Sequence, residues 1–228
     1  MAASLAQREN ERGVLAGHAA LAFVQLCFGL MPIFGKWAFQ PGGFAPLSIV
    51  AWRIFTGALV LSALALARHR RALLLPPRDM ARALLLALLG IVLNQALYIE
   101  GLARTTAMQA GLFTCLIPVF TFVVATCLGQ ERFAPGRAVG VLVALAGAAP
   151  LFVARGAQLE LSRGALYLAG CALVYSFYLV LSKPMLARHP PLVVLAWVYV
   201  GSLPGAVTFA WHARLMPADP SSSGVWLA

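Results

Sequence analysis

Four polar or small residues lie along one helical face near the middle of the chain. Asn94, Tyr98, Gly101 and Thr105 follow one another at spacings of four, three and four residues, and Gln95 lies beside them. Residues at these spacings share one side of an α-helix. Two amides and a phenol offer more hydrogen-bonding groups than helix packing requires. We therefore expect Asn94, Gln95, Tyr98 and Thr105 to line the path of a solute, with hydrogen bonding between helices as the alternative.

A second stripe of the same kind occurs near the start of the chain. Gln25, Gly29, Pro32 and Lys36 again recur at spacings of four, three and four residues. We expect these four residues to line the solute path from a second helix. The alternative is that Gly29 and Pro32 allow close helix packing while Gln25 forms a hydrogen bond to a neighbouring helix.

Two tyrosines share a face later in the chain. Tyr175 and Tyr178 are three residues apart, and Ser182 follows them at helical spacing. Aromatic faces suit loosely selective binding of organic solutes, so Tyr175 and Tyr178 are further candidates for the solute path. The alternative is anchoring at the membrane interface, a common place for tyrosine near helix ends.

Arg53 is a charged residue within an apolar run. It lies eight residues inside that run, which is about 12 Å at 1.5 Å per helical residue. A charge at this depth requires a partner, because snorkelling recovers only part of the distance. Glu100, at the end of the next apolar run, is the acidic residue available on that side. We expect an ion pair between Arg53 and Glu100 with a structural role.

The sequence lacks the patterns of several other site types. The four cysteines form no CxxC pair, and His18 and His212 each stand alone, so we expect no metal site. No Walker loop is present. A lipid-modifying enzyme would need clustered Asp, His or Cys at a membrane edge, so we expect neither a catalytic residue nor a cofactor.

The composition excludes a water-soluble fold. Of the 228 residues, 61% are hydrophobic and 11% are charged, and the mean hydropathy is +0.86. Charges this sparse could not cover a globule of this size. The net charge of +10 comes from basic residues placed between apolar runs, without a basic face, which argues against nucleic-acid binding.

Seven apolar stretches are long enough to cross, or nearly cross, a hydrocarbon core of roughly 30 Å. None shows the alternation of a β-barrel strand, so the sequence predicts an all-α, polytopic helical membrane bundle. The predicted spans are 14–35, 45–67, 83–99, 105–128, 138–154, 164–182 and 191–211.

The basic residues predict the orientation of the bundle. Eleven Lys and Arg residues fall on the side of the N-terminus and five on the opposite side. By the positive-inside rule, we expect the N-terminus in the cytoplasm and the chain in the cell (plasma or inner) membrane.

The chain contains an internal repeat. Segments 17–36 and 164–183 each run from Gly to Lys at an offset of 147 residues, and PLSIVAW (46–52) matches PLVVLAW (191–197) at an offset of 145. Five predicted spans separate the equivalent helices, so the second copy would cross the membrane inverted, as in secondary transporters. We expect these parts: a cytoplasmic N-terminal segment 1–13, a first five-helix repeat 14–154, an outer linker 155–163, and an incomplete second repeat 164–228 with two helices and the start of a third.

Three stretches carry a family resemblance. Residues 94–152, with a Thr-rich turn, a Pro-Val helix and a Gly-x-Glu-Arg loop in that order, resemble the third to fifth helices of an EamA domain of the drug/metabolite transporter superfamily. AWRIFTGALVL (51–61) resembles the second helix, and GALYLAGCALVYSFYLVLSKPML (164–186) resembles the start of the second repeat. The resemblance implies ten helices in two EamA units, of which we expect the last three to be missing from this sequence.

The resemblance implies a permease that moves a small organic metabolite or drug, in the efflux direction, by gradient-driven alternating access. The excess of Lys36, Arg53 and Arg104 over Glu100 at the outer mouth favours an anionic or zwitterionic solute. The expected partners are this solute and the lipid bilayer, and the sequence leaves a homo-oligomer open. The alternatives are a truncated fragment that does not transport, a polytopic membrane enzyme, or a receptor.

Overall fold

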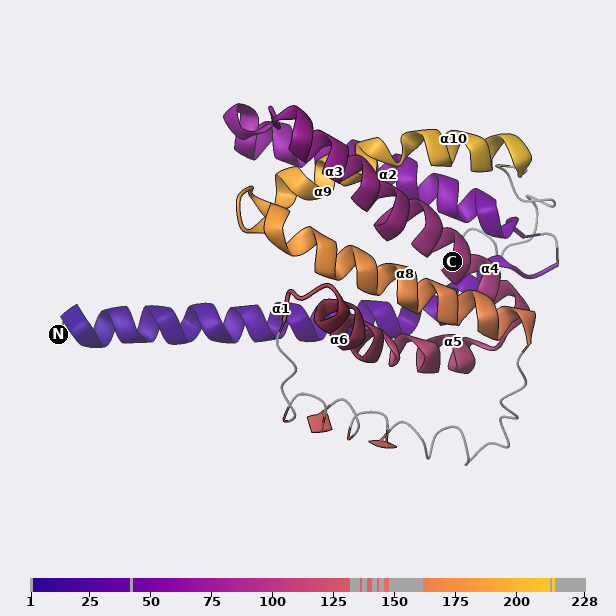
Figure 1. Cartoon of the computed structure of the whole chain (residues 1–228), viewed down its shortest axis with the longest axis horizontal. Coiled ribbons are helices and arrows are strands. Elements are labelled where there is room, and N and C mark those ends of the chain that lie inside the picture. The colour runs from indigo at the N-terminus through magenta and orange to yellow at the C-terminus, as the bar shows by residue number, and fades with distance from the viewer. Residues whose placement is uncertain are drawn as a thin grey trace.

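A computed structural model describes residues 2–41, 43–131, 136, 139–140, 143, 146–147, 162–213 and 215 (Figure 1). Within these residues the regular structure is helical and no strand occurs. The elements are α1 (Ala2–Ala38), α2 (Pro46–His69), the 3₁₀ turn η1 (Arg70–Ala72), α3 (Pro77–Ala87), the π-helix η2 (Leu88–Leu93), α4 (Asn94–Arg104), α5 (Ala107–Thr114), α6 (Ile117–Cys127), α8 (Arg163–Leu186), α9 (Pro191–Gly201) and α10 (Leu203–His212).

Within the described residues, six helical stretches are long and apolar enough to cross a membrane, which confirms the predicted all-α polytopic class. A predicted seventh span, 138–154, lies mostly outside the described residues. The six are Gly17–Ala38, Pro46–His69, Pro77–Arg104, Ala107–Cys127, Arg163–Leu186 and Pro191–His212.

Prolines set where several of these helices begin. Pro46, Pro77 and Pro191 each occupy the first turn of a helix, where proline needs no hydrogen-bond acceptor for its nitrogen and has its φ angle preset. The third span consequently begins at Pro77, six residues before the predicted start, and extends to Arg104. At the N-terminus, α1 is already helical from Ala2, so residues 2–13 continue the first helix.

Two further spans are interrupted where proline follows a helix end. Cys115 and Leu116 separate α5 from α6, and Pro118 lies in the first turn of α6. Ser202 separates α9 from α10, with Pro204 in the first turn of α10. Proline lacks the N–H group that would continue the ladder of the preceding helix, so each span bends at this point.

Helix α8 lies at the centre of the bundle (Figure 1). It packs against α4 and α6, whereas α9 packs against α2 and α3, and α10 packs against α2. The largest buried cluster includes Ile54 of α2, Leu86 of α3 and Val194 of α9. These contacts bring the later helices between the earlier ones.

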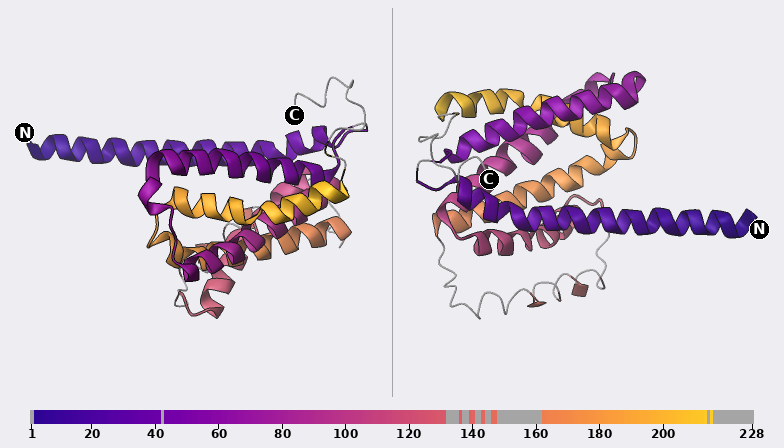
Figure 2. Two further views of the ribbon diagram at one scale, coloured as in Figure 1. Left: turned by 90° about the horizontal axis from the view of Figure 1, so that it is seen from above. Right: turned by 180° about the vertical axis from the view of Figure 1, so that it is seen from behind.

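Helix α1 lies at the periphery and extends far beyond the rest of the bundle at its N-terminal end (Figure 2). It contacts α4 and α5, and little of its apolar span is buried. Near its C-terminal end, Gly35 allows α1 to approach α4, because a Cβ atom there would lie 2.7 Å from Leu102 Cδ2.

Candidate functional site

A cavity of about 320 Å³ lies inside the bundle. Its volume falls at the low end of the range for small-molecule sites, roughly 300–1,000 Å³. Its walls come from α1, α2, η2, α4, α5, α6, α8 and α9. The lining residues are Phe28, Met31, Arg53, Gly90, Ile91, Asn94, Gln95, Tyr98, Ala110, Phe113, Thr114, Ile117, Leu168, Cys171, Ala172, Tyr175, Tyr178, Leu195 and Tyr199.

Three of the residues predicted on the middle helix line this cavity: Asn94, Gln95 and Tyr98. Asn94 Nδ2 donates to Cys171 Sγ at 3.2 Å and to the Cys171 carbonyl at 3.5 Å, which joins α4 to α8. The Gln95 side chain is different, because the residue is 6% exposed and its Oε1 has no hydrogen-bond partner. A buried amide oxygen without a donor carries a desolvation cost, so Gln95 offers an unused acceptor in the wall.

The π-helical turn lies directly before these amides. The N–H of Asn94 donates to the Leu89 carbonyl, five residues earlier, as well as to the Ile91 carbonyl. Gly90 and Ile91 of this turn belong to the cavity wall. Single π turns inside α-helices are frequent at functional sites, because they widen the helix locally.

Tyrosines form much of the aromatic wall. The rings of Tyr175 and Tyr178 stack with centroids 5.6 Å apart and an interplanar angle of 23°. The ring of Tyr178 lies against Gly90, in space that a Cβ atom at Gly90 would occupy. Tyr199 lies against Gly57 in the same way, and sequence reasoning missed it. The signal that the sequence offered for these ring positions was the glycine on each facing helix, Gly90 and Gly57, which leaves room for a ring.

Arg53 lines the cavity but does not pair with Glu100, so that prediction is wrong. Glu100 pairs with Arg104, one turn further along the same helix. Arg53 Nη1 instead contacts Met31 Sδ at 3.4 Å. Glu100 pairs with Arg104 because side chains four residues apart on one helix lie side by side, so this ion pair needs no contact between helices. Among the described residues that line the cavity, Arg53 is the one charged side chain.

The predicted stripe on the first helix lies off the cavity. Phe28 and Met31 of α1 face the cavity instead. Gln25 and Gly29 are exposed, while Pro32 is buried. The rotation of α1 is fixed near its end, where Lys36 Nζ donates to the Ala103 carbonyl of α4 at 3.3 Å.

Thr105 also lies off the cavity wall. It is buried, and its hydroxyl donates to the Gly101 carbonyl at 2.9 Å. Its methyl group fills the space beside Gly164 of α8. Thr114, one of the lining residues, bonds to the Ala110 carbonyl of its own helix at 3.0 Å.

A second cavity of about 760 Å³ adjoins the first between α1 and α2. Met31 and Arg53 line both cavities. The contact between Met31 and Arg53 therefore lies at the boundary between the two cavities.

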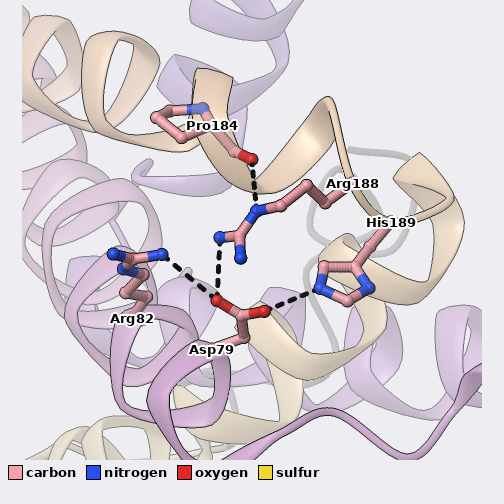
Figure 3. Close-up of polar contacts among 5 residues, drawn as sticks. All are labelled: Asp79, Arg82, Pro184, Arg188 and His189. Atoms are coloured by element: carbon pink, nitrogen blue, oxygen red, sulfur yellow. Dashed lines mark hydrogen bonds and ion pairs between the residues drawn. The ribbon is translucent and has the colours of Figure 1, made fainter.

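A cluster of charged groups joins α3 to the connection between α8 and α9, two parts of the chain that are distant in sequence (Figure 3). Asp79 of α3 contacts Arg188 Nη2 and His189 Nε2 of the α8–α9 connection, each at 2.8 Å. Arg82 adds a contact of 3.3 Å, and Arg188 Nε also donates to the Pro184 carbonyl at 3.1 Å. The Asp79 side chain is 2% exposed because these partners cover it. Sequence reasoning missed this cluster, because Arg188 and His189 lie more than a hundred residues from Asp79 along the chain.

The described residues contain no group of three His, Cys, Asp or Glu side chains that could hold a metal ion. The cysteines also remain separate, with Cys171 buried in the wall and Cys27, Cys115 and Cys127 exposed. The lining side chains offer hydrogen-bonding groups and aromatic faces to a bound molecule.

Comparison with known proteins gives one matching family and several relatives. The EamA-like transporter family matches residues 15–153. WAT1-related protein At4g30420 of Arabidopsis thaliana is 26% identical over 235 residues, which cover 89% of this chain and 62% of that protein. A probable terminal-alkyne amino-acid exporter of Streptantibioticus cattleyicolor is 30% identical over 217 residues, which cover 79% of this chain and 71% of the exporter.

The fold is similar to that of solved structures. A protein described only as "Crystal structure of protein" superposes with a TM-score of 0.63 at 23% identity, over 89% of this chain and 68% of that one. This likeness concerns the fold alone. The chain spans only part of the length of its plant relatives. It covers 62% of WAT1-related protein At4g30420 and 53% of WAT1-related protein At5g13670.

Proposed function

Because the chain belongs to the EamA-like transporter family, we propose that it moves a small organic solute across the plasma membrane through the cavity described above. The observation that carries the proposal is a small set of polar side chains in the largely apolar wall of a cavity inside the bundle. Asn94, Gln95 and Arg53 lie around a hollow of about 320 Å³. Polar groups at this depth are costly unless they serve a partner helix or a solute.

The proposed mechanism is alternating access between inverted repeats. The internal repeat supports it, because α8 corresponds to the membrane-spanning part of α1 at an offset of 147 residues, and α9 corresponds to the start of α2 at an offset of 145 residues. The Asp79 cluster ties α3 to the α8–α9 connection at one end of the bundle. We assign this cluster to the gate that closes that end. Opening it would separate Asp79 from Arg188 and His189.

The proposed direction is efflux, with the N-terminus in the cytoplasm. The basic residues support this orientation, since eleven of them lie on the side of the N-terminus and five on the other. A relative named as an amino-acid exporter supports the direction. The sequence has no Walker loop, so a solute or ion gradient supplies the driving force.

Solute flux with a matched pair of variants tests the proposal. Ala172→Trp fills the cavity from α8, whereas Leu166→Trp adds the same side chain at an exposed position of the same helix. Host cells that produce the full chain should release one or more small solutes faster than cells without it, by mass spectrometry of the medium. Ala172→Trp should abolish this release, and Leu166→Trp should retain it. Equal release by both variants, at equal membrane levels, would contradict transport through this cavity.

Labelling of Cys171 tests the gate separately. In a chain with Cys27, Cys115 and Cys127 replaced by Ser, Cys171 reports on access to the cavity wall. Asp79→Asn should raise the rate at which N-ethylmaleimide modifies Cys171. An unchanged rate, measured from both sides of the membrane, would remove the gate assignment and leave the transport proposal in place.

A further inference from the structure

The connection between α2 and α3 carries arginines at the level of the membrane surface. One apolar span ends at His69 and the next begins at Pro77, so residues 70–76 lie where lipid headgroups meet water. Arg68, Arg70 and Arg78 flank this connection, and all three are exposed. Their side chains form no hydrogen bond or ion pair with any residue that the structure describes. Three guanidinium groups are therefore available to a ligand at this surface.

The acidic side chains near these arginines are already engaged. Asp79 directly follows Arg78, but its side chain is 2% exposed and it contacts three other basic groups. Glu131, at the same end of α8, contacts Lys183 at 2.6 Å. Within the described part of the chain, neither carboxylate is left to neutralise the three exposed arginines.

The backbone of the connection is held in place by the bundle. Leu75 is buried in the largest core cluster, and the Leu73 carbonyl accepts a hydrogen bond of 2.8 Å from Trp197 Nε1 of α9. Leu74, between these two anchors, is turned outward and is 90% exposed. The arginines therefore flank an exposed leucine on a fixed backbone, and a fixed backbone loses little conformational entropy when it binds a ligand.

An exposed leucine between arginines suits the boundary of a lipid bilayer. Basic clusters next to a membrane span attract anionic headgroups, and guanidinium groups bind phosphate through paired N–H donors. Leu74 can enter the boundary of the acyl region from this position. Further along α3, Leu84 and Leu85 are 54% and 47% exposed, so acyl chains find an apolar surface deeper in the membrane.

We propose that the α2–α3 connection binds an anionic phospholipid, with its headgroup on Arg68, Arg70 and Arg78 and with Leu74 inserted at the level of the acyl chains. A soluble phosphate would offer the same oxygen atoms but no chain for Leu74 to contact, so a lipid is the ligand that fits both features. The described lining of the solute cavity contains none of these four residues, so lipid binding here is separate from solute binding.

Lipid competition tests the proposal. The purified full chain in detergent is mixed with equal amounts of phosphatidylglycerol and phosphatidylethanolamine that carry the same acyl chains, and the bound lipids are counted by native mass spectrometry. We expect phosphatidylglycerol to be retained several-fold over phosphatidylethanolamine. An arginine near an anionic lipid surface contributes about fivefold to binding. The chain with Arg68→Gln, Arg70→Gln and Arg78→Gln combined should therefore lose the preference.

Single substitutions assign the preference to this connection. Arg78→Gln should lower the retention of phosphatidylglycerol by about fivefold. Arg163→Gln is the matched control, because Arg163 is also exposed in the first turn of a helix but lies at the other end of α8 from the Asp79 cluster. It should leave the retention unchanged. Leu74→Ser should lower the retention several-fold, since the inserted apolar side chain is lost.

Three results would overturn the inference, each with a chain that thermal unfolding shows to be folded. The first is equal retention of the two lipids by the unchanged chain. The second is an effect of Arg163→Gln as large as that of Arg78→Gln, which would assign the preference to overall charge. The third is displacement of phosphatidylglycerol by glycerol 3-phosphate, which would make the connection a site for soluble phosphate.

Discussion

Replacing Gly90 by Ala tests how the cavity is built. Gly90 lies in the π-helical turn, and a Cβ atom there would overlap the ring of Tyr178. Because that ring belongs to the cavity wall and stacks on Tyr175, it cannot move freely. Gly90→Ala should therefore push Tyr178 into the cavity or force the two helices apart.

Two opposing terms give the size of the effect. Inserting a methyl group into a packed site costs about 1–3 kcal/mol, and removing a glycine from a helix contributes roughly 0.5–1 kcal/mol in the other direction. The clash exceeds the propensity gain, so the free energy of unfolding should fall by about 0.5–2 kcal/mol. For a chain of this size the unfolding temperature should fall by roughly 1–8 °C.

The assay is thermal unfolding of the purified chain in detergent, with two further variants. Gly29→Ala is the matched control, because nothing lies within 4 Å of a Cβ atom at Gly29, and its unfolding temperature should rise slightly or stay unchanged. In Tyr178→Ala the ring is absent, so adding Gly90→Ala should cost nothing further. The reasoning is refuted if Gly90→Ala behaves like Gly29→Ala, or if its cost persists without the ring.

Three other predictions concern polar contacts. Asp79→Asn should lower the unfolding temperature by more than Glu100→Gln, because Asp79 serves three basic partners and Glu100 serves one that lies on its own helix; equal shifts would contradict this. Ser176→Ala should destabilise the chain by about 0.5–1.5 kcal/mol, since its buried hydroxyl joins α8 to the Ile117 carbonyl at 3.2 Å; a neutral result by thermal unfolding would refute that role. Trp197→Phe should cost about 1 kcal/mol by removing the 2.8 Å bond from Nε1 to the Leu73 carbonyl; no loss of stability would show that water replaces that bond.

The membrane spans could be predicted from the sequence, because length and hydropathy determine which segments cross a bilayer. The start of the third span could not, since Arg78, Asp79 and Arg82 lower its local hydropathy. Asp79 is accommodated by tertiary pairing with Arg188 and His189, and Arg82 pairs with Asp79 on the same helix. A hydropathy window contains no information on partners that lie more than a hundred residues away.

For the cavity residues too, local sequence information was sufficient for some positions, and others depended on tertiary packing. Asn94, Gln95 and Tyr98 were found because they share a helix face within two turns and their neighbours are apolar. The face of α1 was predicted wrongly, since Gln25 is polar but α1 turns Phe28 to the cavity. Rotation of a helix about its axis depends on its packing partners, and for α1 these are α4 and α5.

The π-helical turn has a consequence for the evolution of this site. A turn closed by bonds from residue i to i−5 holds one residue more than the α-helical turn that it replaces. Loss of a single codon within 88–93 would therefore restore regular winding without rotating the residues that follow, and Asn94 and Gln95 would keep their direction. Single-residue deletions elsewhere in a helix turn everything downstream by about 100°. At this turn the contour of the wall and its polar groups can evolve separately.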